Sequence, residues 1–190
     1  DIMDYKTVVD TLINPYTDYP IQSPSELASV LRRIVSEGED RENKTLELIR
    51  AIPRLIIFYN YSYELEALKG LVELAGKPLY EYNGKRHDFV PKETDVEWVY
   101  LVQYNAGAEG WNCISTDSIL FYSLNHSYKK MEQSMGRIDR VNTPYTDLHY
   151  YMMTSHSSID KARLRAISTK KEFNDVLWVK KTFKSKFGEK

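Results

Sequence analysis

The run EQSMGRIDR, from Glu132 to Arg140, brings a glutamine, a glycine and two arginines close together. A guanidinium group recognises phosphate or carboxylate oxygens through a planar, multidentate set of donors. Two such groups on one short helix, Arg137 and Arg140, repel each other unless an anion usually lies in front of them. Their spacing therefore raises the possibility of an anion-binding site.

A helix from about 128 to 140 would divide this run into two faces. Gln133, Arg137 and Arg140 fall at i, i+4 and i+7, which is one polar stripe. The second stripe, with the same spacing on the opposite side, consists of Met131, Met135 and Ile138. We expect the apolar stripe to pack on a sheet and the polar stripe to present an amide and two guanidinium groups.

Gly136 adjoins the polar stripe and leaves room for close approach by a ligand or another domain. A solvated basic face, with the arginines paired to Glu132 and Asp139, is the alternative interpretation. The run by itself does not decide between them.

Elements that could position this helix follow a regular order. Five apolar segments have strand length, at 55–60, 79–82, 98–104, 118–123 and 148–153. Helical periodicity appears at 63–76 and again at 128–140. Strands that alternate with helices predict βαβ units and a mainly parallel sheet of about five to seven strands, with helices on both faces. Ligands of such sheets bind at the carboxyl ends of the strands, where we expect 105–112 and 125–133 to lie together.

Three parts of the chain are predicted. Residues 1–52 form a lead-in segment with two helices, one after the cap at Ser23 and one over 44–52. The stretch before Pro24 is expected to be extended or loop-like, and GEDREN at 38–43 a charged surface loop. Residues 53–165 form the α/β domain, and residues 166–190 a C-terminal helix and a lysine-rich tail.

Composition limits the classes of function. The chain has 190 residues, 42% hydrophobic and 28% charged, with a net charge of −1. A generally basic surface for nucleic acid is excluded, so contact with phosphates must come from a local patch. The single cysteine, Cys113, excludes an internal disulfide and a cysteine cluster for zinc. No apolar run reaches membrane-span length, and we expect a cytoplasmic, intracellular protein with no metal site of its own. A first residue other than methionine indicates a piece of something longer.

Two motifs resemble those of a known family. Gln-x-x-Gly-Arg-x-x-Arg at 133–140 resembles the sixth motif of superfamily 2 helicases and translocases. QYNAGAEGWN at 103–112 is similar to the fifth motif in its Swi/Snf-like form, with matches at Ala106, Gly107, Gly110 and Asn112. RLIIFYNYSYELEAL at 54–68 resembles the fourth motif. Their order and spacing agree over most of the chain.

The resemblance implies the second, C-terminal RecA-like domain of such a motor, a P-loop NTPase-type three-layer fold. A Gly-x-x-x-x-Gly-Lys-Ser/Thr phosphate loop is absent from the sequence. ATP and Mg²⁺ would therefore be held mainly by a missing N-terminal RecA-like domain of the same polypeptide. DNA, or alternatively RNA, would be the other partner.

Roles follow residue by residue from the resemblance. Arg140 is the first choice for an arginine finger on the γ-phosphoryl group, with Arg137 beside it on the phosphates or coupling the domains. Gln133 would orient water or an arginine. Asn112 and Gly110 would lie near the nucleotide or the domain boundary, although Asn112 as a simple turn residue is an equal alternative.

The nucleic-acid side of the site is expected in the fifth-motif loop. Ala106 and Gly107 would let the backbone pass close to phosphates, or the glycines would serve only turn geometry. Tyr104 and Trp111 flank that loop and are candidates for stacking on a base.

Departures from the family pattern narrow the kind of helicase or translocase that we expect. VNT follows the last arginine where Swi/Snf proteins have Ile-Gly-Gln, and NHSY replaces Trp-Asn-Pro upstream of the helix. A bacterial or phage DNA helicase or translocase therefore fits better than a chromatin remodeller. An RNA helicase half and a non-catalytic nucleic-acid-binding or regulatory module remain alternatives.

Overall fold

The protein is an α/β fold built on a five-stranded, all-parallel sheet with the strand order β2-β3-β1-β4-β5. A computed structural model describes residues 2–106 and 111–187. The strands are β1 (Arg54–Tyr59), β2 (Leu79–Tyr82), β3 (Trp98–Gln103), β4 (Ser118–Phe121) and β5 (His149–Met152). Each coincides, to within one residue at its start, with a segment predicted from its apolar residues. The expected fold class is confirmed.

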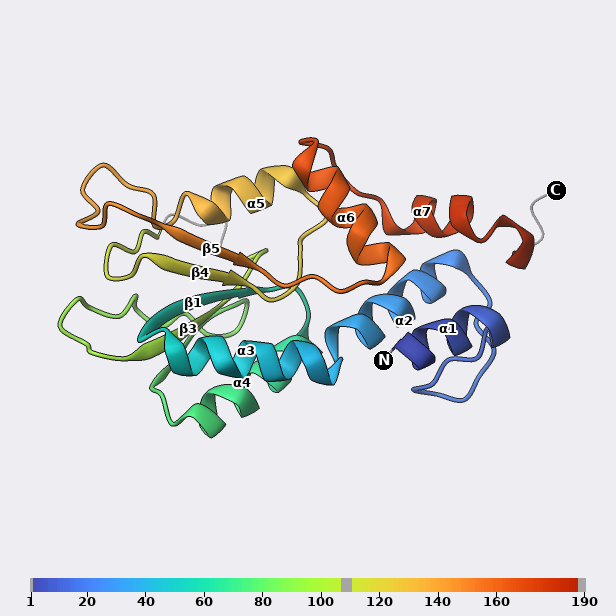
Figure 1. Ribbon diagram of the computed structural model, residues 1–190, viewed down its shortest axis with the longest axis horizontal. Helices are drawn as coiled ribbons and strands as arrows, with labels where there is room; N and C mark the ends of the chain where they lie inside the picture. Colours follow the sequence, from blue (N-terminus) through green and yellow to red (C-terminus); the bar gives the residue numbers. More distant parts are fainter. Residues whose placement is uncertain (1, 107–110, 188–190) are drawn as a thin grey trace.

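Helices cover both faces of the sheet (Figure 1). One face packs against α3 (Glu39–Ala51) and α4 (Ser62–Ala75), and the other against α5 (Tyr128–Met135). Because β1 lies at the centre under both layers, its side chains from Leu55 to Tyr59 are buried, as a continuous apolar run predicts. Gly76 ends α4 with φ of 68°, a left-handed conformation that glycine adopts without strain.

A separate group of helices lies beyond the carboxyl ends of the strands (Figure 1). It consists of α1 (Ile2–Thr11), α2 (Pro24–Ser36) and α7 (Asp175–Thr182), and α6 (Ser158–Ser168) connects it to the sheet. Val8, Leu27, Leu31 and Val179 are buried in its own apolar core. The two ends of the described chain therefore pack together; we call α1, α2 and α7 the helical unit.

Buried ion pairs attach the helical unit to the rest of the fold. Asp175 of α7 accepts hydrogen bonds from Arg32 of α2 at 2.6 Å and from Arg163 of α6 at 2.8 Å. Arg41 of α3 donates to Asp160 of α6 at 2.7 Å and to the Tyr122 carbonyl at the end of β4. These pairs join the helical unit, α6 and the sheet.

Two expectations for the lead-in segment were wrong. The opening residues form α1 because Val8 has a buried place against α2, which overrides the irregular appearance of this stretch. The stretch 39–43 is the first turn of α3 and not a loop. Acidic residues there favour the helix N-terminus, and Arg41 turns inward to Asp160.

Among the described residues, no helix is long and apolar enough to cross a membrane.

Candidate functional site

The helix that carries the paired arginines is shorter than its periodicity predicts. Ser127 caps the start of α5, and the helix ends at Met135, with Gly136 as its C-cap. Glycine is a poor helix residue, and the backbone amide of Arg137 turns to the Ser134 carbonyl at 3.2 Å. The carbonyl of Arg137 then accepts a hydrogen bond from Cys113. Arg137 and Arg140 therefore lie in a turn after the helix, and the single polar stripe with Gln133 was wrong.

Arg137 points into the protein rather than away from it. Its side chain donates from Nη1 to the Trp111 carbonyl at 3.0 Å, and its guanidinium lies 5.5 Å from the centroid of the Trp111 ring. The residue is only 7% exposed. Burial, and then the charge of nearby Arg140, lower the pKa of Arg137 from its ordinary value. The apolar stripe behaves as predicted, since Met131 and Ile138 are buried against the sheet and Met135 packs beside them.

The two aromatic residues proposed for base stacking are part of the core. Tyr104 is 3% exposed, and its hydroxyl donates to the Ser123 carbonyl at 2.9 Å. Trp111 is 9% exposed and packs near Phe58 and Tyr100. Neither ring is accessible for stacking on a base, so this expectation was wrong. Trp111 instead forms the surface on which Arg137 lies.

Arg140 is half-buried beside Arg137. Its Nε atom is buried and has no hydrogen-bond partner, and the residue forms no ion pair within 2–106 and 111–187. The solvated alternative, an ion pair with Glu132 or Asp139, is therefore not present for Arg140. Gln133 is exposed on α5.

The fifth-motif segment is described only in part. Ala106 is half-buried in the turn that follows β3, and Asn112 is exposed next to Trp111. Gly107 and Gly110 lie outside the described residues. The roles predicted for Ala106, Asn112 and the two glycines therefore stay predictions.

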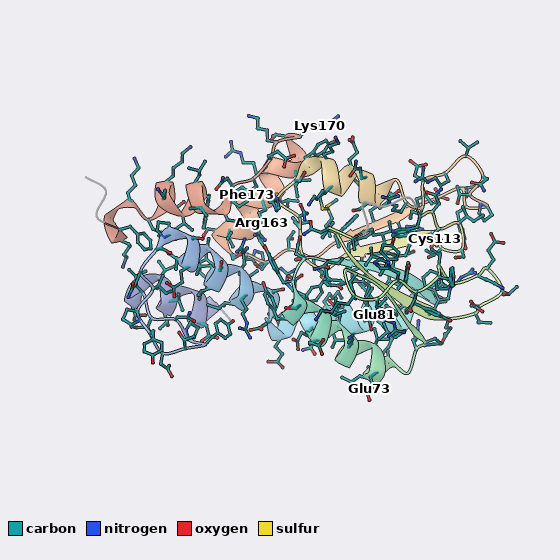
Figure 2. All side chains as sticks on the ribbon, turned by 180° about the vertical axis from the view of Figure 1, so that it is seen from behind. Glu73, Glu81, Cys113, Arg163, Lys170 and Phe173 are labelled. Carbon is teal, nitrogen blue, oxygen red and sulfur yellow. The ribbon has the colours of Figure 1, made fainter. Side chains whose placement is uncertain are left out.

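The arginines and the fifth-motif segment were expected together at the carboxyl edge of the sheet. Arg137 does contact Trp111 of that segment, but the expected position was wrong, because the contact lies over the face of the sheet and not at its carboxyl edge. The start of α5 lies at that edge, where Lys130 donates to the Asn105 side chain at 2.5 Å. From there the eight-residue helix runs back over the sheet for about 12 Å. Its last residue, Met135, accepts a hydrogen bond from Tyr150 of β5. Figure 2 shows Cys113, which is bonded to Arg137, on the side of the molecule away from Lys170 and Arg163.

The carboxyl edge instead contains a buried polar network that motif reading did not single out. Glu64, 2% exposed at the start of α4, accepts from the backbone amides of Asn60 and Tyr61 and from the hydroxyls of Ser36 and Ser123. Glu64 lies in the stretch that resembles the fourth motif, but that resemblance did not indicate a buried network. Both carboxylate oxygens of Glu64 already accept hydrogen bonds, and we interpret the network as structural.

Three other polar features of the described residues give no sign of a second site. An open cleft beside α4 and β2 is lined by Glu73 and Glu81 (Figure 2), and Glu81 pairs with Lys69 and Arg86. Burial raises the pKa of the Cys113 thiol, as expected for a packing residue. The described residues contain no group of three or more histidine, cysteine or acidic side chains that could hold a metal ion.

Comparisons with known proteins agree with this fold. No protein-family model matches the chain. It is 22% identical over 163 residues to helicase SWR1 of Candida glabrata, a match that covers 85% of this chain and 11% of that protein. The C-terminal part of the Fun30 ATPase domain has a similar structure, with a TM-score of 0.62 and 11% identity over 86% of this chain and 60% of that one.

These matches define the fold as that of the RecA-like C-terminal part of a helicase-type ATPase. The chain spans only a small part of the curated helicase and about three fifths of the solved ATPase chain. Neither match supports the expected bacterial or phage source.

Proposed function

We propose that this chain is the C-terminal motor domain of an ATP-dependent DNA helicase or translocase. In this proposal the turn from Gly136 to Arg140 faces a nucleotide held by an N-terminal RecA-like domain of a longer polypeptide. Arg140 contacts the phosphates, and Arg137 supports it or couples the two domains. The named relative is itself a helicase, and the structural neighbour is part of an ATPase domain.

One observation carries the proposal. A cation buried on an indole lies beside a second, half-buried cation that has no ion-pair partner among the described residues. The charge of Arg140 beside a second guanidinium group is unfavourable for stability unless an anion often lies next to Arg140. A purely structural turn has no need of Arg140.

The residues of this turn fit a phosphate group. The buried Nε of Arg140 is a donor without an acceptor, and a phosphate oxygen is a suitable acceptor for it. ATP and Mg²⁺ would supply the phosphoryl group and its charge neutralisation. A guanidinium that meets the negative charge of the transition state contributes about 10³–10⁵ in rate in such enzymes. Gln133, exposed on the preceding turn of α5, remains the candidate for orienting water or an arginine.

A test of this proposal compares the chain alone with the longer polypeptide. Pure 190-residue protein is expected to hydrolyse no ATP, because its sequence contains no phosphate loop. The polypeptide that also contains an ATP-binding half is expected to hydrolyse ATP faster when DNA is added. A phosphate-release assay measures both. DNA-stimulated turnover by the chain alone, or an inactive longer polypeptide, would refute the proposal, and stimulation by RNA only would favour the RNA helicase alternative.

A further inference from the structure

Four lysines from two distant parts of the chain lie near the end of α5 that is opposite the arginine turn. Lys129 and Lys130 belong to the first turn of α5, and Lys170 and Lys171 follow the end of α6. We call these four residues the α5–α6 basic surface. Figure 1 shows the start of α5 beside the end of α6, and Figure 2 shows Lys170 at the outer surface.

Specific contacts hold the two segments together. The ammonium group of Lys170 lies 6.0 Å from the centroid of the Tyr128 ring. Phe173 donates from its backbone amide to the His126 carbonyl at 2.8 Å, and Ser127 and Glu172 are joined through their side chains at 3.1 Å. Lys170 itself has φ of 56°, the left-handed conformation that ends α6. The lysines are therefore placed by tertiary structure and are not a run of charge in one loop.

The charges of this surface are not neutralised by ion pairs. Lys129, Lys170 and Lys171 are exposed, and none of the four lysines forms an ion pair with a residue that the structure describes. The nearby Glu132 accepts a hydrogen bond from Tyr128, and Glu172 is joined to Ser127. In a chain of net charge −1, this is a local concentration of positive charge. Such a patch complements a polyanion.

The position of this surface favours a nucleic-acid backbone as that polyanion. Lys130 donates a hydrogen bond to Asn105, which belongs to the fifth-motif segment and precedes Ala106. The basic surface is thus continuous with the segment for which phosphate contact is predicted. It lies at the start of α5, whereas the arginine turn follows the end of the same helix.

We propose that the α5–α6 basic surface binds the sugar–phosphate backbone of DNA, and that Lys170 and Lys171 extend the contact beyond the helicase motifs. This rests on the proposed function, which supplies DNA as the partner. Helix α5 then connects a DNA-binding end to a nucleotide-facing end.

The test is a titration of fluorescein-labelled duplex DNA with the wild-type chain and with the double variant Lys170→Glu/Lys171→Glu, followed by anisotropy at two salt concentrations. The variant is expected to raise the Kd on the order of tenfold at low salt and to reduce the slope of log K against log salt by about 2, one unit for each lost phosphate contact. A matched control, Lys181→Glu/Lys184→Glu, makes the same charge change at exposed lysines of the C-terminal segment. Lys170→Arg/Lys171→Arg should retain binding.

The outcomes separate this inference from the proposed function. The proposal that the basic surface binds DNA is overturned if the Kd of the Lys170/Lys171 variant is unchanged, or if the control variant loses the same affinity. The proposed motor function stands in either case. Tighter binding of an RNA duplex, or equal binding of labelled oligoglutamate, overturns the choice of DNA. A wild-type chain that binds no DNA at low salt counts against both. Circular dichroism melts confirm that each variant is folded.

Discussion

Trp111 explains how a buried arginine can remain charged in this protein. Its carbonyl accepts from Arg137, and its ring faces the guanidinium group. A cation over an indole is stabilised by about 0.5–2 kcal/mol, and by more when water is excluded. Trp111 is therefore a positioning residue for the arginine turn and not a contact for a base.

Replacement of Trp111 by leucine tests this role. The loss of a buried indole is expected to lower the free energy of unfolding by about 2–4 kcal/mol, measured by urea denaturation. In the complete motor the same change should also reduce ATP turnover, because Arg137 loses its support. Trp178→Leu, in the helical unit, is the matched control. Equal effects of both variants on turnover would show that only stability matters.

Sequence reasoning proposed Arg137 and Arg140 as site residues but did not predict their surroundings. Spacing in the chain gives the face of an ideal helix, and it contains no information on where a helix ends within one turn. The burial of Arg137 follows from the early end of α5 and from Cys113, which hydrogen-bonds to the turn. A long-range contact of this kind is not visible in local periodicity.

Gly136 lets α5 end where it does, and its position tolerates a methyl group at ordinary contact distance. Its φ is −64°, and an added Cβ would approach no atom closer than 3.5 Å. Gly136→Ala should therefore leave the melting temperature of the chain unchanged or slightly higher. If another domain approaches this turn, the same variant should reduce ATP turnover in the complete motor. A strongly destabilised chain would contradict the local geometry, and full turnover would contradict the close approach.

Elements with continuous apolar runs were the most predictable part of the fold. β1 and β3 are buried on both faces, and their composition leaves no alternative to a central strand. The helix α1 was missed because its stabilisation comes from α2 and α7 rather than from its own periodicity. The start of α3 was missed for a related reason, since Arg41 is stabilised by Asp160, far away in the sequence.

The stability of the whole molecule is expected to depend on Asp175, which joins the helical unit to α6. The carboxylate of Asp175 forms ion pairs with both Arg32 and Arg163, and the residue is 9% exposed. Removal of one partner from a buried ion pair leaves uncompensated charge, so Asp175→Asn is expected to cost about 2–4 kcal/mol in a urea titration. Glu47→Gln, which breaks the exposed pair with Lys44, should cost less than about 1 kcal/mol. Equal stability of the two variants would show that the ion pairs of Asp175 contribute no more to the fold than an exposed pair does.

The closed carboxyl edge has a consequence for the complete protein. Because α2, α6 and their buried charges lie there, the proposed function places the meeting with a second domain at the half-buried arginine turn over the sheet face. The three predicted parts of the chain stay a prediction, although 1–52 and 166–190 contribute to one shared helical core.

Nucleotide-dependent turnover of an Arg140→Lys variant in the complete polypeptide tests the central claim most directly. Lysine keeps the charge but lacks the planar fork of donors. We predict that DNA-stimulated ATP hydrolysis falls by about 10³ or more, while ATP binding and melting temperature stay close to wild type. Arg165→Lys, an exposed arginine of α6, is the control and should retain full turnover. Wild-type turnover in Arg140→Lys would contradict the account, and so would a loss of thermal stability large enough to explain the loss of activity.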